Sequence, residues 1–309
     1  MEVWAPGRVN LMGDHTDYGG GLVLPVAVQL GIALSFEVAE SFELDAPGGE
    51  RYATAVREEL AALGRPDVSI RGVVAADLPQ GAGLGSSGAF EVAVALALCE
   101  AAGFDLDPLA LAEACRRAEQ RAVGVPSGIL DQAASLLGRA GHGLLLDCGS
   151  LEHRWVALPG DVAILVLDSG ERHAHEGSGY GDRRRELESG HARRVRHVEA
   201  ENARVRETAA ALERGDTEAL GAIFAASHAS LRDDYEVSTP ALDALVAAAL
   251  DAGAFAARMT GGGFGGSIVA LAEHGRADDV LARTRARGWV VRSSDGATRR
   301  RTGWSPDRA

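Results

Sequence analysis

A short polar stretch near the start of the chain combines the residue types that bind polyols. Residues 7–18 read Gly-Arg-Val-Asn-Leu-Met-Gly-Asp-His-Thr-Asp-Tyr. Carboxylates and imidazole exchange hydrogen bonds with vicinal hydroxyl groups, and a site built from them rejects analogues that lack a hydroxyl. Asp14, His15 and Asp17 are therefore candidate ligands of a polyhydroxyl molecule. A solvated loop and a metal site are the alternatives, and the metal site is disfavoured because no second histidine stands at a usual ligand spacing.

A glycine-rich stretch at residues 79–89 has the character of a phosphate-binding loop. It leads directly into an Ala- and Leu-rich segment that predicts a helix over residues 86–101. Glycines let the backbone approach a ligand closely, and the unpaired N–H groups of a helix N-terminus favour an anion such as a triphosphate. The hydroxyls of Ser86 and Ser87 can add hydrogen bonds or a hard oxygen ligand for magnesium. A tight turn capped by serines is the alternative.

A second glycine-rich stretch lies far along the chain, between two predicted strands. Residues 258–266 read Arg-Met-Thr-Gly-Gly-Gly-Phe-Gly-Gly, which is too long for a two-residue hairpin turn. Ordering so many glycines costs conformational entropy that a plain turn need not incur. The stretch therefore predicts close approach of the backbone to another group, with a flexible hairpin loop as the alternative.

The charge balance excludes several classes of partner. Among 309 residues, 44 are acidic and 31 basic, which gives a formal net charge of −13. This charge opposes nucleic acid or an anionic membrane as the main partner. All the basic residues are arginines, so the phosphate-binding lysine of Walker-type loops and protein kinases is missing. A phosphate site in this chain has to be built from backbone amides and arginine.

Cysteine usage and the absence of long apolar runs bear on the compartment. Cys99, Cys115 and Cys148 are isolated and odd in number, which argues against a disulfide framework or a structural zinc site. No apolar run approaches the roughly 18 residues of a membrane span, and residues 1–10 lack the pattern of an export signal. We expect a cytoplasmic protein, with a monomer favoured.

Hydrophobic periodicity predicts mixed strands and helices without strict alternation, which indicates an α+β fold. Strands are predicted at residues 30–38, 69–74, 144–146, 155–158, 162–168, 267–271 and 289–292, with a further strand running into 261. Helices are predicted at residues 52–63, 86–101, 108–123, 183–214, 217–231 and 239–252. Ser127 is expected to cap a further helix that ends near Leu137 and carries Asp131 in or near its first turn. The composition changes near residue 160, where we place a domain boundary.

Taken together, the three stretches resemble the three motifs of the GHMP small-molecule kinases, in the same order. Residues 7–18 are similar to the galactokinase signature, residues 124–132 to that family's catalytic-aspartate segment, and residues 227–238 to a further galactokinase stretch. The resemblance covers nearly the whole chain. It implies a two-domain α+β architecture, with a ribosomal-S5-domain-2-like N-terminal domain over residues 1–160 and a ferredoxin-like C-terminal domain over residues 161–309.

The resemblance also implies an activity: transfer of the γ-phosphoryl group of MgATP to the anomeric 1-hydroxyl of galactose, giving galactose 1-phosphate and ADP. Asp131 matches the catalytic aspartate and Arg8 the arginine beside it. The positions matching sugar contacts are Asp14, His15, Asp17, Gly128 and Tyr180. The positions matching contacts to ATP are Gly81, Gly83, Leu84, Gly85, Ser86, Ser87, Gly88, Gly262 and Gly263. The positions matching ligands of Mg²⁺ are Ser86 or Ser87, together with Glu119.

The sequence departs from the family pattern in ways that bear on the sugar. Asp14 stands where the family usually has Glu, Gly88 replaces the usual Ala, and few residues precede Arg8. The segment between residues 38 and 72 is also short. Another sugar-1-kinase of the superfamily, such as an N-acetylgalactosamine or arabinose kinase, is therefore an alternative. A catalytically silent sugar and ATP sensor is a second one, disfavoured because Arg8, Asp131 and the serine pair are all present.

Two groups of residues are expected to have no functional role. Arginines alternate with glutamates over residues 183–201, which predicts a solvated helix face; they are Arg183, Arg184, Arg185, Arg193, Arg194 and Arg196. Several histidines lack ligand spacing and are expected on the surface or in loops; they are His173, His175, His191 and His197.

Overall fold

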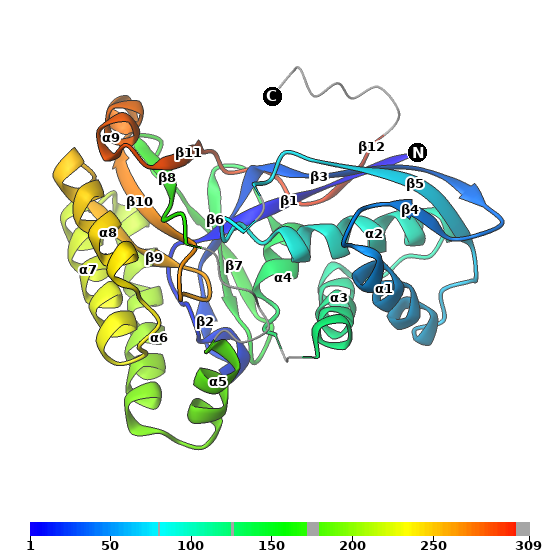
Figure 1. The fold of residues 1–309 in the computed structure, drawn as a ribbon, viewed down its shortest axis with the longest axis horizontal. Helices are drawn as coiled ribbons and strands as arrows, with labels where there is room; N and C mark the ends of the chain where they lie inside the picture. Colours follow the sequence, from blue (N-terminus) through cyan, green and yellow to red (C-terminus); the bar gives the residue numbers. More distant parts are fainter. Residues whose placement is uncertain (80, 125–126, 172–178, 301–309) are drawn as a thin grey trace.

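The computed structural model describes residues 1–79, 81–124, 127–171 and 179–300 (Figure 1). Its strands are β1 (Glu2–Asn10), β2 (Leu22–Val23), β3 (Pro25–Ala39), β4 (Glu43–Asp45), β5 (Ser69–Ala76), β6 (His142–Asp147), β7 (His153–Ala157), β8 (Val162–Asp168), β9 (Ala256–Thr260), β10 (Ser267–Glu273), β11 (Arg287–Val291) and β12 (Thr298–Arg300). Its α-helices are α1 (Glu50–Ala62), α2 (Ser86–Ala102), α3 (Pro108–Val123), α4 (Leu130–Leu137), α5 (Tyr180–Glu188), α6 (Ala192–Arg214), α7 (Thr217–Asp233), α8 (Pro240–Ala252) and α9 (Ala277–Thr284). Short 3-10 turns occupy Asp17–Gly19 and His274–Arg276.

The first sheet supports the site from one side. Its strand order is β12-β1-β3-β5-β4, antiparallel except for the β4–β5 pair. Helices α1 to α4 lie on one face of this sheet (Figure 1). Helix α2 is the central one: Ala, Val and Leu make it apolar all round, and it is buried without interruption from Gly88 to Cys99. Strand β12 returns from the far end of the chain to pair with β1, close to the N-terminus.

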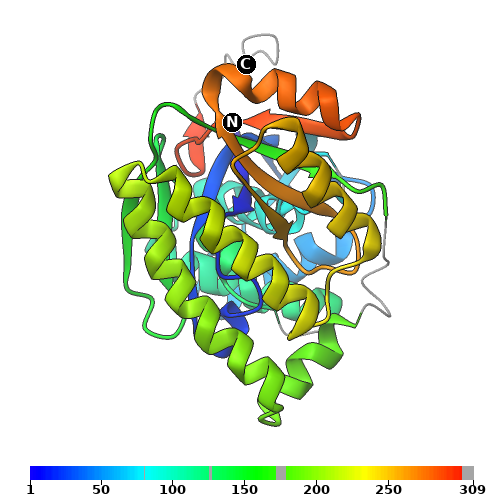
Figure 2. The ribbon, with the colours of Figure 1, turned by 90° about the vertical axis from the view of Figure 1, so that its left-hand side faces the viewer.

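The second sheet, of order β11-β8-β10-β9, is antiparallel throughout. Helices α6 and α7 lie side by side, and α7 and α8 pack against β9 (Figure 2). A small third sheet pairs β2, which lies between β1 and β3 in the chain, with β6 and β7 in the order β2-β6-β7. Within the described ranges, no helix has the length and apolar character needed to cross a membrane.

Most of the predicted elements are present, and the α+β class is confirmed. The single helix predicted over residues 183–214 is wrong: α5 and α6 are separate, because Gly190 adopts a positive φ of 79° that ends the first helix. Ser127 caps no helix either, since α4 begins only at Leu130. The domain boundary near residue 160 stays a prediction.

Candidate active site

The three motif stretches meet at one cavity of about 650 Å³. Nearly all the predicted site residues line it: Arg8, Asp14, His15, Asp17, Gly81, Gly83, Leu84, Gly85, Ser86, Ser87, Glu119, Gly128, Asp131, Tyr180, Gly262 and Gly263. Gly88 is the exception, since it lies inside α2 and away from the cavity wall. The wall also includes Tyr52, Glu171 and Asp182, which the sequence did not single out, and Arg185, which was expected on a solvated helix face.

An ion pair between Arg8 and Asp131 occupies the centre of the cavity wall. Residues 7–10 end strand β1 instead of forming a loop, and a bulge at Gly7 shifts the register. A Cβ at Gly7 would lie 2.6 Å from the Leu84 carbonyl oxygen, so glycine permits the close approach, and the Arg8 N–H donates to that oxygen at 2.9 Å. The Arg8 side chain is thereby directed to Asp131, with Nη2 2.6 Å from Oδ1.

Glycines also make room for Asp131 at the N-terminus of α2. A Cβ at Gly88 would lie 2.7 Å from Cβ of Asp131, and one at Gly85 would lie 3.2 Å from its Oδ2. Even a methyl group at position 88 would therefore have to displace the first turn of α4. In this chain Gly88 acts as a spacer behind Asp131 and does not contact the cavity.

The loop before α2 presents backbone donors to the cavity. Gly81, Gly83 and Gly85 all adopt positive φ angles, of 71°, 69° and 69°, which glycine adopts without a steric penalty. Helix α2 then starts at Ser86 without a side-chain cap. Its first N–H groups are thus available to an anion, and the helix dipole favours negative charge there.

The oxygen atoms of Ser87 and Glu119 lie together beside this loop. Ser87 Oγ donates to Glu119 Oε1 at 3.0 Å, and both residues line the cavity. Burial, followed by repulsion from Asp131, raises the pKa of Glu119. Within the described residues no cluster of three His, Cys, Asp or Glu side chains could enclose a metal. This sparse set of hard oxygens suits Mg²⁺, which usually takes few protein ligands and completes its shell with water and phosphate.

Aromatic rings surround His15, which also lines the cavity. His15 adopts a left-handed φ of 64°, and its ring centroid lies 4.7 Å from Tyr235 and 5.5 Å from Tyr180. Burial lowers the pKa of His15 to about 3, with His197 adding to the effect, so the imidazole is neutral at pH 7. Its Nε2 is buried and has no hydrogen-bond partner among the described residues.

Behind His15, two tyrosines that sequence reasoning did not assign hold the ring in place. The Tyr18 hydroxyl oxygen lies 3.1 Å from His15 Nδ1 and 2.6 Å from the Tyr235 hydroxyl oxygen. Tyr235 falls in the stretch 227–238 that resembles galactokinases, and this was the available signal.

Asp17 is a half-buried carboxyl in the cavity wall whose charge is disfavoured in the folded protein. Burial, with repulsion from Asp131 as the next cause, raises its pKa from 3.8 to about 7. The folded protein therefore binds a proton that the unfolded chain has released, and Asp17 lowers stability as the pH rises from about 4 through 7.

We expect Asp17→Asn to stabilise the protein above pH 7 and to leave it nearly unchanged at pH 4. The pKa displacement from 3.8 to about 7 corresponds to a gain of up to ~4 kcal/mol. Thermal unfolding of both proteins between pH 4 and pH 8 measures the difference. An equal effect at both ends of the range would show that Asp17 is not buried with a raised pKa.

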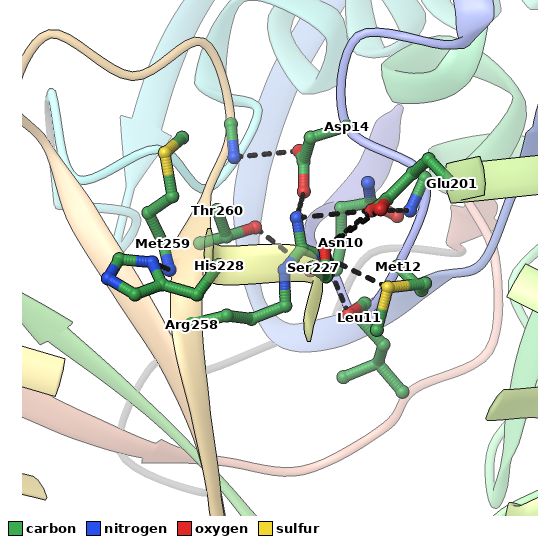
Figure 3. Close-up of polar contacts among 12 residues, drawn as sticks. Asn10, Leu11, Met12, Asp14, Glu201, Ser227, His228, Arg258, Met259 and Thr260 are labelled. Carbon is green, nitrogen blue, oxygen red and sulfur yellow. Dashed lines mark hydrogen bonds and ion pairs between the residues drawn. The ribbon is translucent and has the colours of Figure 1, made fainter. Parts of the chain in front are cut away.

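The Asp14 carboxylate is engaged by the third motif (Figure 3). Arg258 Nη2 donates to Asp14 Oδ2, and the Gly261 N–H donates to Oδ1 at 2.9 Å. Arg258 is fully buried on β9, and its Nη1 also donates to the Leu11 carbonyl at 2.8 Å. Glu201 of α6 faces the same guanidinium at 3.6 Å. Burial raises the Glu201 pKa, but Arg258, His197 and Arg204 outweigh it and bring it to about 2. The sequence analysis placed Arg258 in the third motif but gave it no role, and it missed Glu201, because a single Glu in a helix carries no motif.

Arg194, expected on a solvated helix face, and His197, expected on the surface or in a loop, are both buried. Arg194 is 2% exposed and pairs with Glu186 and Glu236, so it joins α5 and α6 to the segment after α7. His197 is fully buried, and its Nε2 lies 3.2 Å from the Asp14 carbonyl oxygen. The expectation was wrong for both residues, because charge alternation along a helix does not reveal the partners that other segments bring. His191 is exposed as expected, whereas His173 and His175 lie outside the described residues.

Comparison with known proteins agrees with this geometry. The chain matches the family models for the GHMP kinases N terminal domain over residues 51–139, the GHMP kinases C terminal over residues 208–288, and the galactokinase galactose-binding signature over residues 2–37. Galactokinases of Streptomyces coelicolor and Bos taurus are each 40% identical, in alignments that cover 90% and 91% of this chain and 86% of each relative. The structure of Lactococcus lactis galactokinase complexed with galactose superposes with a TM-score of 0.88 at 26% identity, covering 96% of this chain and 94% of that one.

The chain has the two-domain architecture of the GHMP kinases, and its motif stretches converge on one cavity where α2 begins at Ser86 without a side-chain cap. These features define an ATP-dependent small-molecule kinase of the GHMP class. The identity to the two relatives narrows the class. The chain belongs to the galactokinase family.

Proposed function

We propose that this protein transfers the γ-phosphoryl group of MgATP to the anomeric 1-hydroxyl of galactose. The observation that carries the proposal is the convergence of the Arg8–Asp131 ion pair, the α2 N-terminus and the Asp17–His15 end on one cavity. Phosphoryl transfer needs positioning and charge neutralisation more than covalent chemistry, and these groups supply both.

Each group in the cavity has a role in this proposal. Asp17, His15 and Tyr180 bind and orient the sugar, and Asp131 holds the reacting hydroxyl and accepts its proton. Arg8 lies against Asp131 and neutralises charge on the transferring phosphoryl group. The 81–88 loop and the α2 N-terminus hold the phosphates, with Gly262 and Gly263 closing the cavity. Mg²⁺, held by Ser87 or Ser86 with Glu119, supplies further charge neutralisation when bound.

One observation favours a different sugar. Both oxygens of Asp14 already accept hydrogen bonds from Arg258 and Gly261, so this carboxylate is withdrawn from the sugar more than the longer Glu of the family pattern would be. A sugar-1-kinase with another preference is therefore the second candidate.

A coupled ADP-release assay with MgATP across galactose, N-acetylgalactosamine, glucose, arabinose and a no-sugar control separates these candidates. Galactose-selective release supports the proposal, and release on another sugar moves the specificity while keeping the mechanism. Binding of sugar and ATP without any release would indicate a sensor.

Gly128→Ala tests the sugar end of the cavity. A Cβ at Gly128 would lie 1.7 Å from Asp17 Oδ2, so the substitution must displace that carboxylate. Misplacing a binding group by an ångström costs on the order of 100-fold, and we expect the galactose KM to rise by about that factor with the ATP KM little changed. Gly160→Ala is the control, because nothing lies within 4 Å of its added Cβ. An unchanged galactose KM in Gly128→Ala would remove Asp17 from the sugar site.

We also propose a cytoplasmic monomer. The support for the compartment is that Cys99, Cys115 and Cys148 are all free thiols.

A further inference from the structure

Behind the metal-binding oxygens lies a fully buried carboxyl that the proposed reaction does not use. Glu91 is on α2, one turn after Ser87, and neither it nor Gln132 of α4 is exposed to solvent. Gln132 Nε2 donates to Glu91 Oε2 at 2.9 Å and to Glu119 Oε2 at 3.1 Å. The other Glu119 oxygen accepts from Ser87. Helices α2, α4 and α3 thus each contribute one side chain to a chain of hydrogen bonds from Glu91 through Gln132 to Glu119, which we call the relay.

This relay is costly for stability. Glu91 Oε1 and Gln132 Oε1 have no hydrogen-bond partner among the described residues, and a buried polar group without a partner costs free energy. All the other positions of α2 from Gly88 to Cys99 are buried, and each is glycine, cysteine or an apolar residue. An apolar side chain at position 91 would therefore suit the packing of α2 better than a carboxyl does.

What the relay does is define where the Glu119 carboxylate lies. Gln132 immediately follows Asp131, so its amide position is fixed by the start of α4. The Gln132 side-chain amide donates one N–H to Glu91 and the other to Glu119. The bond to Glu91 fixes the orientation of the amide, so that its second N–H points to Glu119. Without Glu91, the Gln132 side chain could rotate, and Glu119 would keep only the Ser87 contact.

We propose that Glu91 and Gln132 are positioning residues that hold Glu119 beside Ser87 for the divalent cation accompanying the nucleotide. The inference rests on the proposed function, in which Glu119 binds that cation. Partners of this kind, which orient a ligand side chain without touching the metal, typically change metal affinity 10- to 100-fold when removed.

Binding of Mn²⁺ tests the relay without relying on turnover. Free Mn²⁺ is followed by electron paramagnetic resonance during titration of the protein with ADP present. Glu91→Met should raise the Mn²⁺ Kd about tenfold or more, and Gln132→Met should do the same. The double variant should show no further loss, because both changes break one relay. Glu91→Gln keeps an acceptor oxygen for Gln132 and should restore affinity close to wild type.

Glu59→Met is the matched control. Glu59 is also a buried carboxyl, and it binds Arg117 and Arg121 of α3 at 2.9 and 2.6 Å. These arginines lie on the side of α3 opposite Glu119, so the control removes a buried carboxyl that packs on the same helix without touching the relay. Melting temperatures of all variants, measured alongside, separate metal affinity from stability.

The inference is overturned if Glu91→Met and Gln132→Met bind Mn²⁺ like wild type, or if Glu59→Met weakens Mn²⁺ binding equally. It is also overturned if Glu119→Gln leaves the Mn²⁺ Kd unchanged, because the relay would then have no ligand to position. The titration contains no sugar, so it decides the inference even if the ADP-release assay rejects galactose.

Discussion

Asp131→Asn is expected to lower kcat by about 10²- to 10⁴-fold, the range that a positioned acid or base contributes. The substitution keeps the side-chain shape at the start of α4, where Gly85 and Gly88 leave just enough space for it. It removes the charge that pairs with Arg8 at 2.6 Å and the oxygen that accepts the hydroxyl proton. Galactose affinity should change little, because the proposed sugar contacts come from Asp17, His15 and Tyr180.

The measurement is kcat by coupled ADP release together with galactose affinity by calorimetry. Asp67→Asn is the control, since Asp67 also pairs with an arginine, Arg57 at 3.1 Å, but is largely exposed on the surface. Turnover that survives in Asp131→Asn would remove this residue from the reaction. Parallel loss of sugar affinity and kcat would instead assign Asp131 to sugar binding.

Arg258→Met is expected to cause the largest loss of stability, on the order of 3–5 kcal/mol, because it leaves buried carboxylates without their partner. Arg258 is fully buried between Asp14 and Glu201, which are themselves almost or wholly inaccessible to solvent. The backbone carbonyl of Leu11 loses a donor as well. Since these contacts join the first motif to the third (Figure 3), both sugar and nucleotide binding should weaken in the folded fraction.

Urea unfolding at pH 7 measures this loss, with Arg71→Met as the control. Arg71 pairs with Glu43 at 3.0 Å, but both side chains are more than half exposed, and exposed pairs of this kind contribute little. If Arg258→Met unfolds at the same urea concentration as the control, the buried cluster is not what joins the two motifs.

The motifs were predictable from the sequence because their backbone conformations restrict which residue types can occupy them. Positive φ angles at Gly81, Gly83 and Gly85 require glycine, so the loop before α2 is visible in the sequence. Asp131 does lie in the first turn of α4, although the expected cap at Ser127 is absent. These local signals predicted the glycine-rich loop at the N-terminus of α2, whereas the roles of Arg8 and Asp131 came from the resemblance to the galactokinase family and stay predictions.

The supporting contacts could not be predicted, because they join segments far apart in the chain. Arg258 meets Asp14 across 244 positions, and Gln132 meets Glu91 across 41. These residues pair because the fold buries them together. The sequence around a single charged residue in a helix or strand does not show whether that residue is buried. Strand β1 was missed for a different reason, since Pro6 and Gly7 interrupt its pattern at the bulge that brings Arg8 to the loop.

Phosphorus NMR of the product shows whether phosphate is transferred to the anomeric hydroxyl of galactose. Protein, MgATP and galactose should yield a new phosphomonoester whose phosphorus couples to the anomeric proton, in equal amount to the ADP released. A phosphate on any other hydroxyl, inorganic phosphate alone, or no product that depends on galactose would contradict the account.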